Sequence, residues 1–214
     1  MNSIILYKKS FSILEIIFTI VIISILSTQI FYQKRSIKLE QATNKILIHL
    51  KQTRYQAMVD NKFDDMDKYW FRKRWTFKIS NCKDSIGGLY YLIYTDLNKG
   101  GNININETLK DPLNNKFLYA NSHCKSSYET SKDVFITKKY GITKIEQSCN
   151  KSDTIAKIHF EYDGNIYSKL AGNKDIDKEY EYILKDRCEL KIYDDKNNFK
   201  TIVIENNTGY IYLK

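Results

Sequence analysis

The segment from Asp96 to Glu107 carries oxygen-bearing side chains at a spacing that could hold a calcium ion. Asp96, Asn98 and Glu107 match side-chain ligand positions of an EF-hand loop, and Gly100 and Asn102 stand at two further ligand positions. Because Gly100 offers no side-chain oxygen and no flanking helices are expected, binding should be weak, with a dissociation constant of ~10⁻⁴ to 10⁻³ M. A turn rich in Gly and Asn between two strands explains the same residues without a metal, and neither interpretation requires a cofactor.

Four cysteines indicate disulfide chemistry: Cys82, Cys124, Cys149 and Cys188. None belongs to a C-x-x-C pair, so their spacing indicates neither a zinc site nor a redox motif. An even number of cysteines in an exported domain favours two disulfides. Three pairings stay open on the sequence, and of these we favour Cys82–Cys124 with Cys149–Cys188.

Aromatic and basic residues alternate between Tyr69 and Ile79. Such a pattern could bind single-stranded nucleic acid by stacking, with Arg72, Arg74 and Lys78 contacting phosphates. The same alternation is typical of a strand with one buried face and one exposed face, which we favour because most of the aromatic residues share a face. The net charge of +9 is largely carried near the N-terminus, which weakens an argument for nucleic-acid binding from charge.

No combination of nucleophile, base and orienting group can be assembled from the sequence, so we expect no enzymatic activity.

The N-terminal region predicts one long helix that would position these groups. Residues from Phe11 to Tyr32 are apolar with few exceptions, and Glu15 is their only charged residue. This length suffices to cross a membrane, where a lone acid indicates a functional site. From there to Asn61, apolar residues recur at three- and four-residue spacing, which predicts an amphipathic continuation of the helix.

The rest of the chain predicts a β-rich domain. Expected strands lie at Tyr69–Ile79, Gly88–Tyr94, Asp133–Thr137, Thr154–Glu161, Tyr180–Tyr193, Phe199–Glu205 and Tyr210–Leu213. Residues 108–150 read as an insertion or a long loop. The expected fold is therefore α+β: a long N-terminal helix, with a membrane-spanning half and an amphipathic half, packed on a mostly antiparallel β-sheet domain.

The residues before the apolar stretch, Lys8-Lys9-Ser10-Phe11, followed by Glu15, resemble the leader junction of type IV prepilins and pseudopilins. The resemblance implies cleavage between Ser10 and Phe11 by a prepilin peptidase, methylation of the new amine, and pairing of Glu15 with the amine of a neighbouring subunit. This sequence has Ser10 where the family usually has Gly. The end of the helix, the Asp96 loop and the C-terminal hairpins are similar to the H-type minor pseudopilins (the GspH/FimT family), pilin-like in fold.

The resemblance implies a leader peptide at residues 1–10, a transmembrane and assembly helix at 11–61, and a periplasmic domain at 62–214. It implies a minor subunit of a type II secretion pseudopilus or a type IV pilus, working in protein secretion or DNA uptake. Its partners would be the prepilin peptidase, other major and minor pseudopilins, the inner membrane, and secreted cargo or DNA. The location would be the inner membrane, crossed once. An alternative is a DNA-binding minor pilin for natural transformation.

Overall fold

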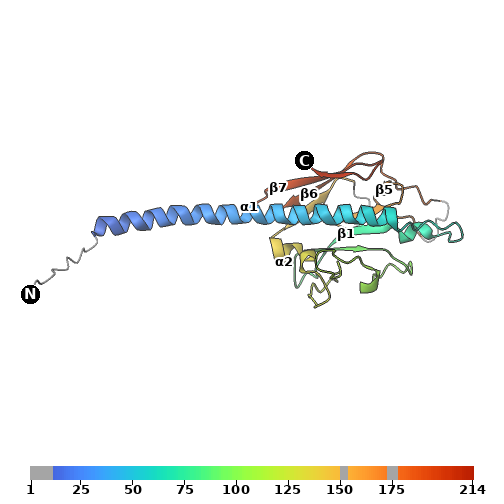
Figure 1. The fold of residues 1–214 in the computed structure, drawn as a ribbon, viewed down its shortest axis with the longest axis horizontal. Helices are drawn as coiled ribbons and strands as arrows, with labels where there is room; N and C mark the ends of the chain where they lie inside the picture. The colour runs from blue at the N-terminus through green and yellow to red at the C-terminus, as the bar shows by residue number, and fades with distance from the viewer. Residues whose placement is uncertain (1–11, 150–153, 173–177) are drawn as a thin grey trace, which may run out of the picture. The chain divides into compact units, whose positions relative to one another are not determined.

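The computed structural model describes residues 12–149, 154–172 and 178–214, with residues 29–36 described by their backbone alone. The chain divides into two units, Met1–Ile37 and Lys38–Lys214. The second unit contains the C-terminal part of the long helix α1, both β-sheets and the shorter helices (Figure 1). The boundary falls inside α1, where the first buried apolar residue among the side chains that the structure describes is Leu39.

Helix α1 extends over Ile13–Val59, which is 47 residues. The Oγ of Ser12 accepts a hydrogen bond from the backbone N–H of Leu14, an interaction typical of a residue that caps the start of a helix. Neither Pro nor Gly interrupts the sequence between Ser12 and Asn61, so the helix can continue without a break. The prediction of one long N-terminal helix is confirmed.

The prediction that one half of this helix spans a membrane is wrong. Among the residues that the structure describes, no helix combines the length and the apolar character needed to cross a membrane. The apolar side chains described at the start of α1 run from Ile13 to Leu26, roughly 21 Å of helix axis, whereas the hydrocarbon core of a bilayer is ~30 Å thick. Ser27 and Thr28 follow them. The predicted location, a single pass through the inner membrane, depended on this span and is therefore also wrong.

Two antiparallel sheets of four strands each form the second unit. The first sheet has the order β2-β1-β4-β5, in which β1 is Trp75–Asn81, β2 is Leu89–Tyr94, β4 is Ala156–Phe160 and β5 is Ile166–Tyr167. The second has the order β3-β6-β7-β8, in which β3 is Lys144–Gln147, β6 is Cys188–Tyr193, β7 is Phe199–Ile204 and β8 is Ile211–Leu213. The prediction of an α+β fold with antiparallel sheets is confirmed.

One hydrophobic core joins both sheets to the C-terminal part of α1. The helix contributes a stripe at three-, four- and seven-residue spacing, Leu39, Ala42, Ile46, Leu50 and Ala57. The first sheet contributes Phe77 and Ile79, and the second contributes Leu190 and Ile192, alternate residues that lie on one face of each strand. Burial of each large aliphatic side chain contributes ~1.5–3 kcal/mol, so this core holds α1 against the sheets.

Several predicted strands are shorter than expected or are not strands. Residues Trp70–Lys73 form the 3₁₀ helix η1, which lets the adjacent side chains of Trp70 and Phe71 both be buried, whereas a strand would expose one of them. Of the strand expected at Tyr180–Tyr193, only β6 is present. The strands β3 and β5 were not predicted from the sequence.

Residues 108–149 are not a loose insertion. They contain the 3₁₀ helix η3 (Lys132–Val134) and helix α2 (Ile136–Tyr140), where the sequence predicted a strand. Ser131 accepts a hydrogen bond from the backbone N–H of Asp133 and begins η3, and Gly141 ends α2 at φ 75°, which favours glycine. Leu118, Val134 and Ile136 are fully buried, so the segment belongs to the core.

Candidate functional site

The start of α1 exposes large apolar side chains to solvent. We call residues Ile13 to Leu26 the apolar segment. Ile13 is 80% exposed, Phe18 62% and Ile23 61%, and their neighbours along the segment are also exposed. Because only Glu15, Thr19 and Ser24 interrupt the apolar residues, these cover every side of the helix rather than one stripe. Such a surface requires burial by several neighbouring elements at once.

Glu15 lies in the first turn of this segment. Its side chain is exposed, and within the described residues its carboxylate has no hydrogen-bonding or ion-pair partner. Ser10 and Phe11, the residues of the expected cleavage site, lie outside the described residues. The expected pairing of Glu15 with a neighbouring amine therefore stays a prediction.

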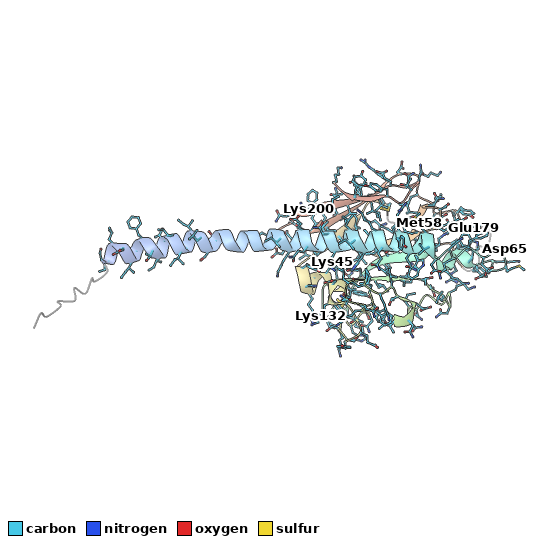
Figure 2. All side chains as sticks on the ribbon, viewed as in Figure 1. Lys45, Met58, Asp65, Lys132, Glu179 and Lys200 are labelled. Carbon is cyan, nitrogen blue, oxygen red and sulfur yellow. A yellow bond between two sulfur atoms is a disulfide. The ribbon has the colours of Figure 1, made fainter. Side chains whose placement is uncertain are left out.

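The C-terminal part of α1 carries a cluster of charged and polar groups that the sequence reading missed. We call Lys45, His49, Asp111, Asp133 and Tyr140 the ionic cluster. Figure 2 labels Lys45 on α1 and Lys132 on η3, and the Nζ of Lys45 is 3.0 Å from Oδ2 of Asp133, the residue after Lys132. Asp133 Oδ1 accepts a hydrogen bond of 2.8 Å from the Tyr140 hydroxyl and a further one from Lys139.

His49 and Asp111 are the most deeply buried members of the ionic cluster, at 1% and 0% exposure. The Nε2 of His49 lies 3.7 Å from Asp111 Oδ2, and its Nδ1 lies 2.6 Å from the Tyr91 hydroxyl. A carboxylate can only accept, so Nε2 carries the proton and the Tyr91 O–H donates to Nδ1. The Asp111 carboxylate also accepts from the Leu113 N–H and the Asn114 side chain. The cluster thus ties residues 111–114 and 133–140 to α1.

The pKa values of the cluster follow from burial and pairing. Burial lowers the pKa of His49 from 6.5 to about 4, against the opposing charge of Asp111. Burial also raises the pKa of Asp133, but hydrogen bonds from Lys139, Tyr140 and Lys45 outweigh this effect and bring it down to about 2. At neutral pH His49 is therefore neutral and Asp133 is ionised.

A sequence signal for the cluster existed. Lys45 and His49 stand four residues apart and flank Ile46, so both lie beside the apolar stripe of the helix. A polar residue beside a buried stripe needs a partner, but the partners are Asp111 and Asp133, which lie far along the chain in residues that the sequence predicted as an insertion or long loop with one strand at Asp133–Thr137.

The Asp96 loop folds around its own carboxylates. Asp96 accepts hydrogen bonds from the backbone N–H groups of Gly100 (3.1 Å) and Gly101 (2.9 Å). Glu107 accepts from the N–H groups of Leu97 (3.1 Å), Asn98 (3.4 Å) and Asn104 (2.9 Å). Both acids are nearly buried, so in this arrangement they cap the loop. Calcium binding through Asp96, Asn98, Gly100, Asn102 and Glu107 stays a prediction.

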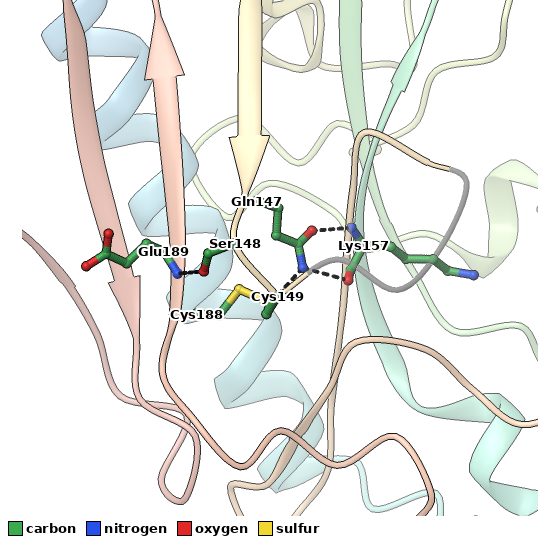
Figure 3. The surroundings of a disulfide bond; sticks show 6 residues. All are labelled: Gln147, Ser148, Cys149, Lys157, Cys188 and Glu189. Atoms are coloured by element: carbon green, nitrogen blue, oxygen red, sulfur yellow. Dashed lines mark hydrogen bonds between the residues drawn. A yellow bond between two sulfur atoms is a disulfide. The ribbon is translucent and has the colours of Figure 1, made fainter.

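The cysteines form the two disulfides that we favoured. Cys82 is bonded to Cys124, and Cys149 is bonded to Cys188. The second bond joins the end of β3 to the start of β6 (Figure 3). Beside it, the Gln147 side chain accepts from the backbone N–H of Lys157 and donates to its carbonyl oxygen, which links β3 to β4. Disulfides of this kind fit an oxidising compartment.

The three basic residues proposed for nucleic-acid contact do not share one exposed face. Arg74 is 2% exposed and donates to Glu161 Oε1 (3.0 Å) and to the Glu179 carbonyl oxygen (2.8 Å). Its guanidinium carbon lies 3.8 Å from the centroid of the Tyr167 ring. Because Arg74 follows η1 and is enclosed, it cannot reach a phosphate, and this part of the prediction is wrong. Arg72 and Lys78 are half-buried.

In the part of the chain that the structure describes, no group of three or more His, Cys, Asp or Glu side chains is arranged to hold a metal ion. Comparisons of the chain with protein-family models, with curated proteins and with solved structures find no match.

Proposed function

We propose that this chain is a subunit of a pilus-like filament and assembles through the apolar segment of α1. Its place would be that of a minor pseudopilin or pilin in a type II secretion system or a type IV pilus, serving protein secretion or DNA uptake. The role is mechanical: the helix joins the filament, and the disulfide-bonded domain presents a surface to other subunits or cargo.

The exposure of the apolar segment on all sides of the helix carries this proposal. A single groove on a partner would cover one stripe and leave the other aliphatic side chains in water. A bundle of like helices covers every side, because each helix has neighbours in several directions. The energy available is large, since each fully buried Ile, Leu or Phe contributes ~1.5–3 kcal/mol.

The position of Glu15 supports the same proposal. Its carboxylate would enter the bundle together with the aliphatic residues around it, and a buried carboxylate without a cation is strongly unfavourable. The resemblance to prepilins supplies the cation, namely the N-terminal amine that cleavage before Phe11 would create on a neighbouring copy. An ion pair of this kind would fix the register of each added subunit.

Leader processing gives the first test. The full chain is expressed with a prepilin peptidase, and its N-terminus is determined by mass spectrometry. We expect loss of the first ten residues and a methylated amine on Phe11. A Ser10→Gly variant should be processed at least as fast, and Ser10→Arg should block processing. A wild-type chain that keeps its leader in the presence of an active peptidase contradicts the proposal.

Cross-linking gives the second test. A photo-reactive amino acid at Ile20, within the apolar segment, should yield a ladder of cross-linked subunits in cells that assemble the filament. The same probe at Tyr128, which is 90% exposed in the folded unit, is the comparison position. Glu15→Gln keeps the shape of the side chain and removes its charge, so it should weaken the ladder at Ile20. An unchanged ladder would remove Glu15 from the assembly mechanism.

A further inference from the structure

Two lysines face each other across the first sheet. In the antiparallel pairing of β1 with β4, Lys78 lies opposite Lys157. Directly opposite side chains share a face of the sheet and lie close together, and like charges at such positions are destabilising. Phe77 and Ile79 point into the core against α1, so Lys78, between them, points to the other face. The side chain of Lys157 extends away from Gln147 and the disulfide (Figure 3).

These two lysines have no counterion among the described residues. Both are half-buried, and neither ammonium group makes a hydrogen bond or an ion pair there. Burial lowers the pKa of Lys78. Burial, followed by the charge of Lys78, lowers the pKa of Lys157 to about 8, and the charges of Arg72 and Lys169 act in the same direction.

Asp96 is the carboxylate that opposes this accumulation of positive charge at Lys157. Its two oxygens are already used by the N–H groups of Gly100 and Gly101. The positive charges of Lys78, Arg72 and Lys169 thus act on Lys157, and the Asp96 carboxylate opposes them. This arrangement leaves an excess of positive charge on the outer face of β1 and β4.

His159 adds a buried polar atom without a partner on the same face. It lies two residues from Lys157 on β4, opposite Thr76, and is fully buried. The Thr76 hydroxyl donates to the Arg74 carbonyl oxygen (3.0 Å), so it accepts from His159 Nδ1, which lies 2.6 Å away. The Nε2 atom of His159 has no hydrogen-bonding partner. Because Nδ1 carries the proton, Nε2 is a buried hydrogen-bond acceptor, which is costly unless a donor satisfies it.

The second sheet shows how this protein treats a lysine on a strand elsewhere. Lys191 on β6 lies opposite Glu146 on β3, so its charge faces an opposite charge. The Lys78–Lys157 pair has the same ladder geometry with two like charges. The difference points to a missing anion rather than to a general tolerance of lysine in the sheets.

We propose that the outer face of β1 and β4 binds a phosphate-type dianion between Lys78 and Lys157. Two facing ammonium groups balance one doubly charged oxyanion, whereas a carboxylate would leave one of them uncompensated. Lysine binds phosphate as a point charge on a flexible stem, which suits a small tetrahedral ligand. The phosphate could be free in solution or form the end of a larger molecule such as a nucleic acid. This inference is independent of filament assembly.

Thermal unfolding of the full chain tests the proposal, with inorganic phosphate compared against chloride at equal ionic strength. Phosphate at about ten times its dissociation constant should raise the Tm by about 3–6 °C. Lys157→Met and Lys78→Met should each remove this rise. In chloride, both variants should be at least as stable as the wild type, because each removes a repulsion. Lys191→Met is the matched control and should keep the phosphate effect.

Two results would overturn the proposal: no rise in Tm for the wild type, or a rise that survives in both Lys157→Met and Lys78→Met. The second would mark an adventitious ion only. A single-stranded oligonucleotide with a 5′-phosphate, compared with the same strand without it, identifies the source. Stabilisation by the phosphorylated strand assigns a terminal phosphate of a larger molecule, and stabilisation by inorganic phosphate alone assigns the free ion.

Discussion

The two parts of helix α1 use apolar residues in opposite ways. In the apolar segment, Ile, Leu, Val and Phe fill most positions and are exposed, whereas from Leu39 to Ala57 apolar residues recur at helical spacing and are buried against the sheets. Polar residues also differ. Glu15 has no partner within the described residues, but Lys45 and His49 join an ionic cluster with residues of the domain. Apolar character alone therefore does not say where a helix is buried; the spacing of its polar residues does.

An isoleucine-to-alanine substitution in each part of α1 should show the largest difference between the two parts in the free energy of unfolding. Ile46 is fully buried, so Ile46→Ala should lower the free energy of unfolding by ~2–5 kcal/mol through lost burial and the cavity left behind. Ile20 is 58% exposed, so Ile20→Ala should change the free energy of unfolding by less than ~0.5 kcal/mol. Urea unfolding followed by the fluorescence of Trp70 and Trp75 measures both. Equal losses of unfolding free energy in the two variants would contradict the division of α1 into an exposed and a buried part.

Removal of the central carboxylate of the ionic cluster should have the next largest effect. Asp133→Ala leaves Lys45 and Tyr140 without their acceptor, and breaking a buried pair in this way costs about 3 kcal/mol. The matched control is Glu146→Ala, which breaks the exposed pair with Lys144 and should leave the urea midpoint unchanged. If both variants unfold at the same urea concentration, the cluster does not anchor the second part of α1.

A pH dependence should follow from the buried histidines, each of which contributes less per pH unit than either substitution above. The pKa of His49 is about 4 in the folded chain and that of His159 also lies far below its ordinary value, in both cases because of burial. Protons therefore bind the unfolded chain first, and stability falls as the pH drops from about 6.5 toward 4. The expected slope is on the order of 1 kcal/mol per pH unit for each histidine.

The variant His49→Gln isolates the contribution of the cluster, because glutamine can still accept a hydrogen bond from Tyr91 but does not titrate. Urea midpoints between about pH 7 and pH 5 should then fall with roughly half the wild-type slope. An unchanged slope would assign the whole effect to groups outside the ionic cluster.

Local patterns in the sequence predicted much of the fold. The long helix, the strands at β2, β4, β7 and β8 and the pairing of the cysteines agree with the structure. These features depend on short-range signals such as periodicity, turn residues and the absence of Pro and Gly.

The features that the sequence did not predict depend on tertiary contacts. Trp70 and Phe71 are both buried because residues 70–73 form η1 rather than a strand, and with Ala171 they make a small cluster that no alternating pattern could indicate. The sequence predicted Arg74 to be an exposed base, but in the structure it pairs with Glu161, which lies far along the chain. The ionic cluster and the Lys78–Lys157 pair likewise combine residues from separate elements, so they become visible only when the strand register is known.

The hydrogen bonds between Gln147 and the backbone of Lys157 have a consequence for self-association. Here a side chain occupies the N–H and C=O groups that an added strand would otherwise use. A foreign strand that tried to extend β4 at this position would first have to displace the glutamine amide. In the filament that we propose, this contact would keep neighbouring copies from joining their sheets at β4, so that assembly would proceed through the helices.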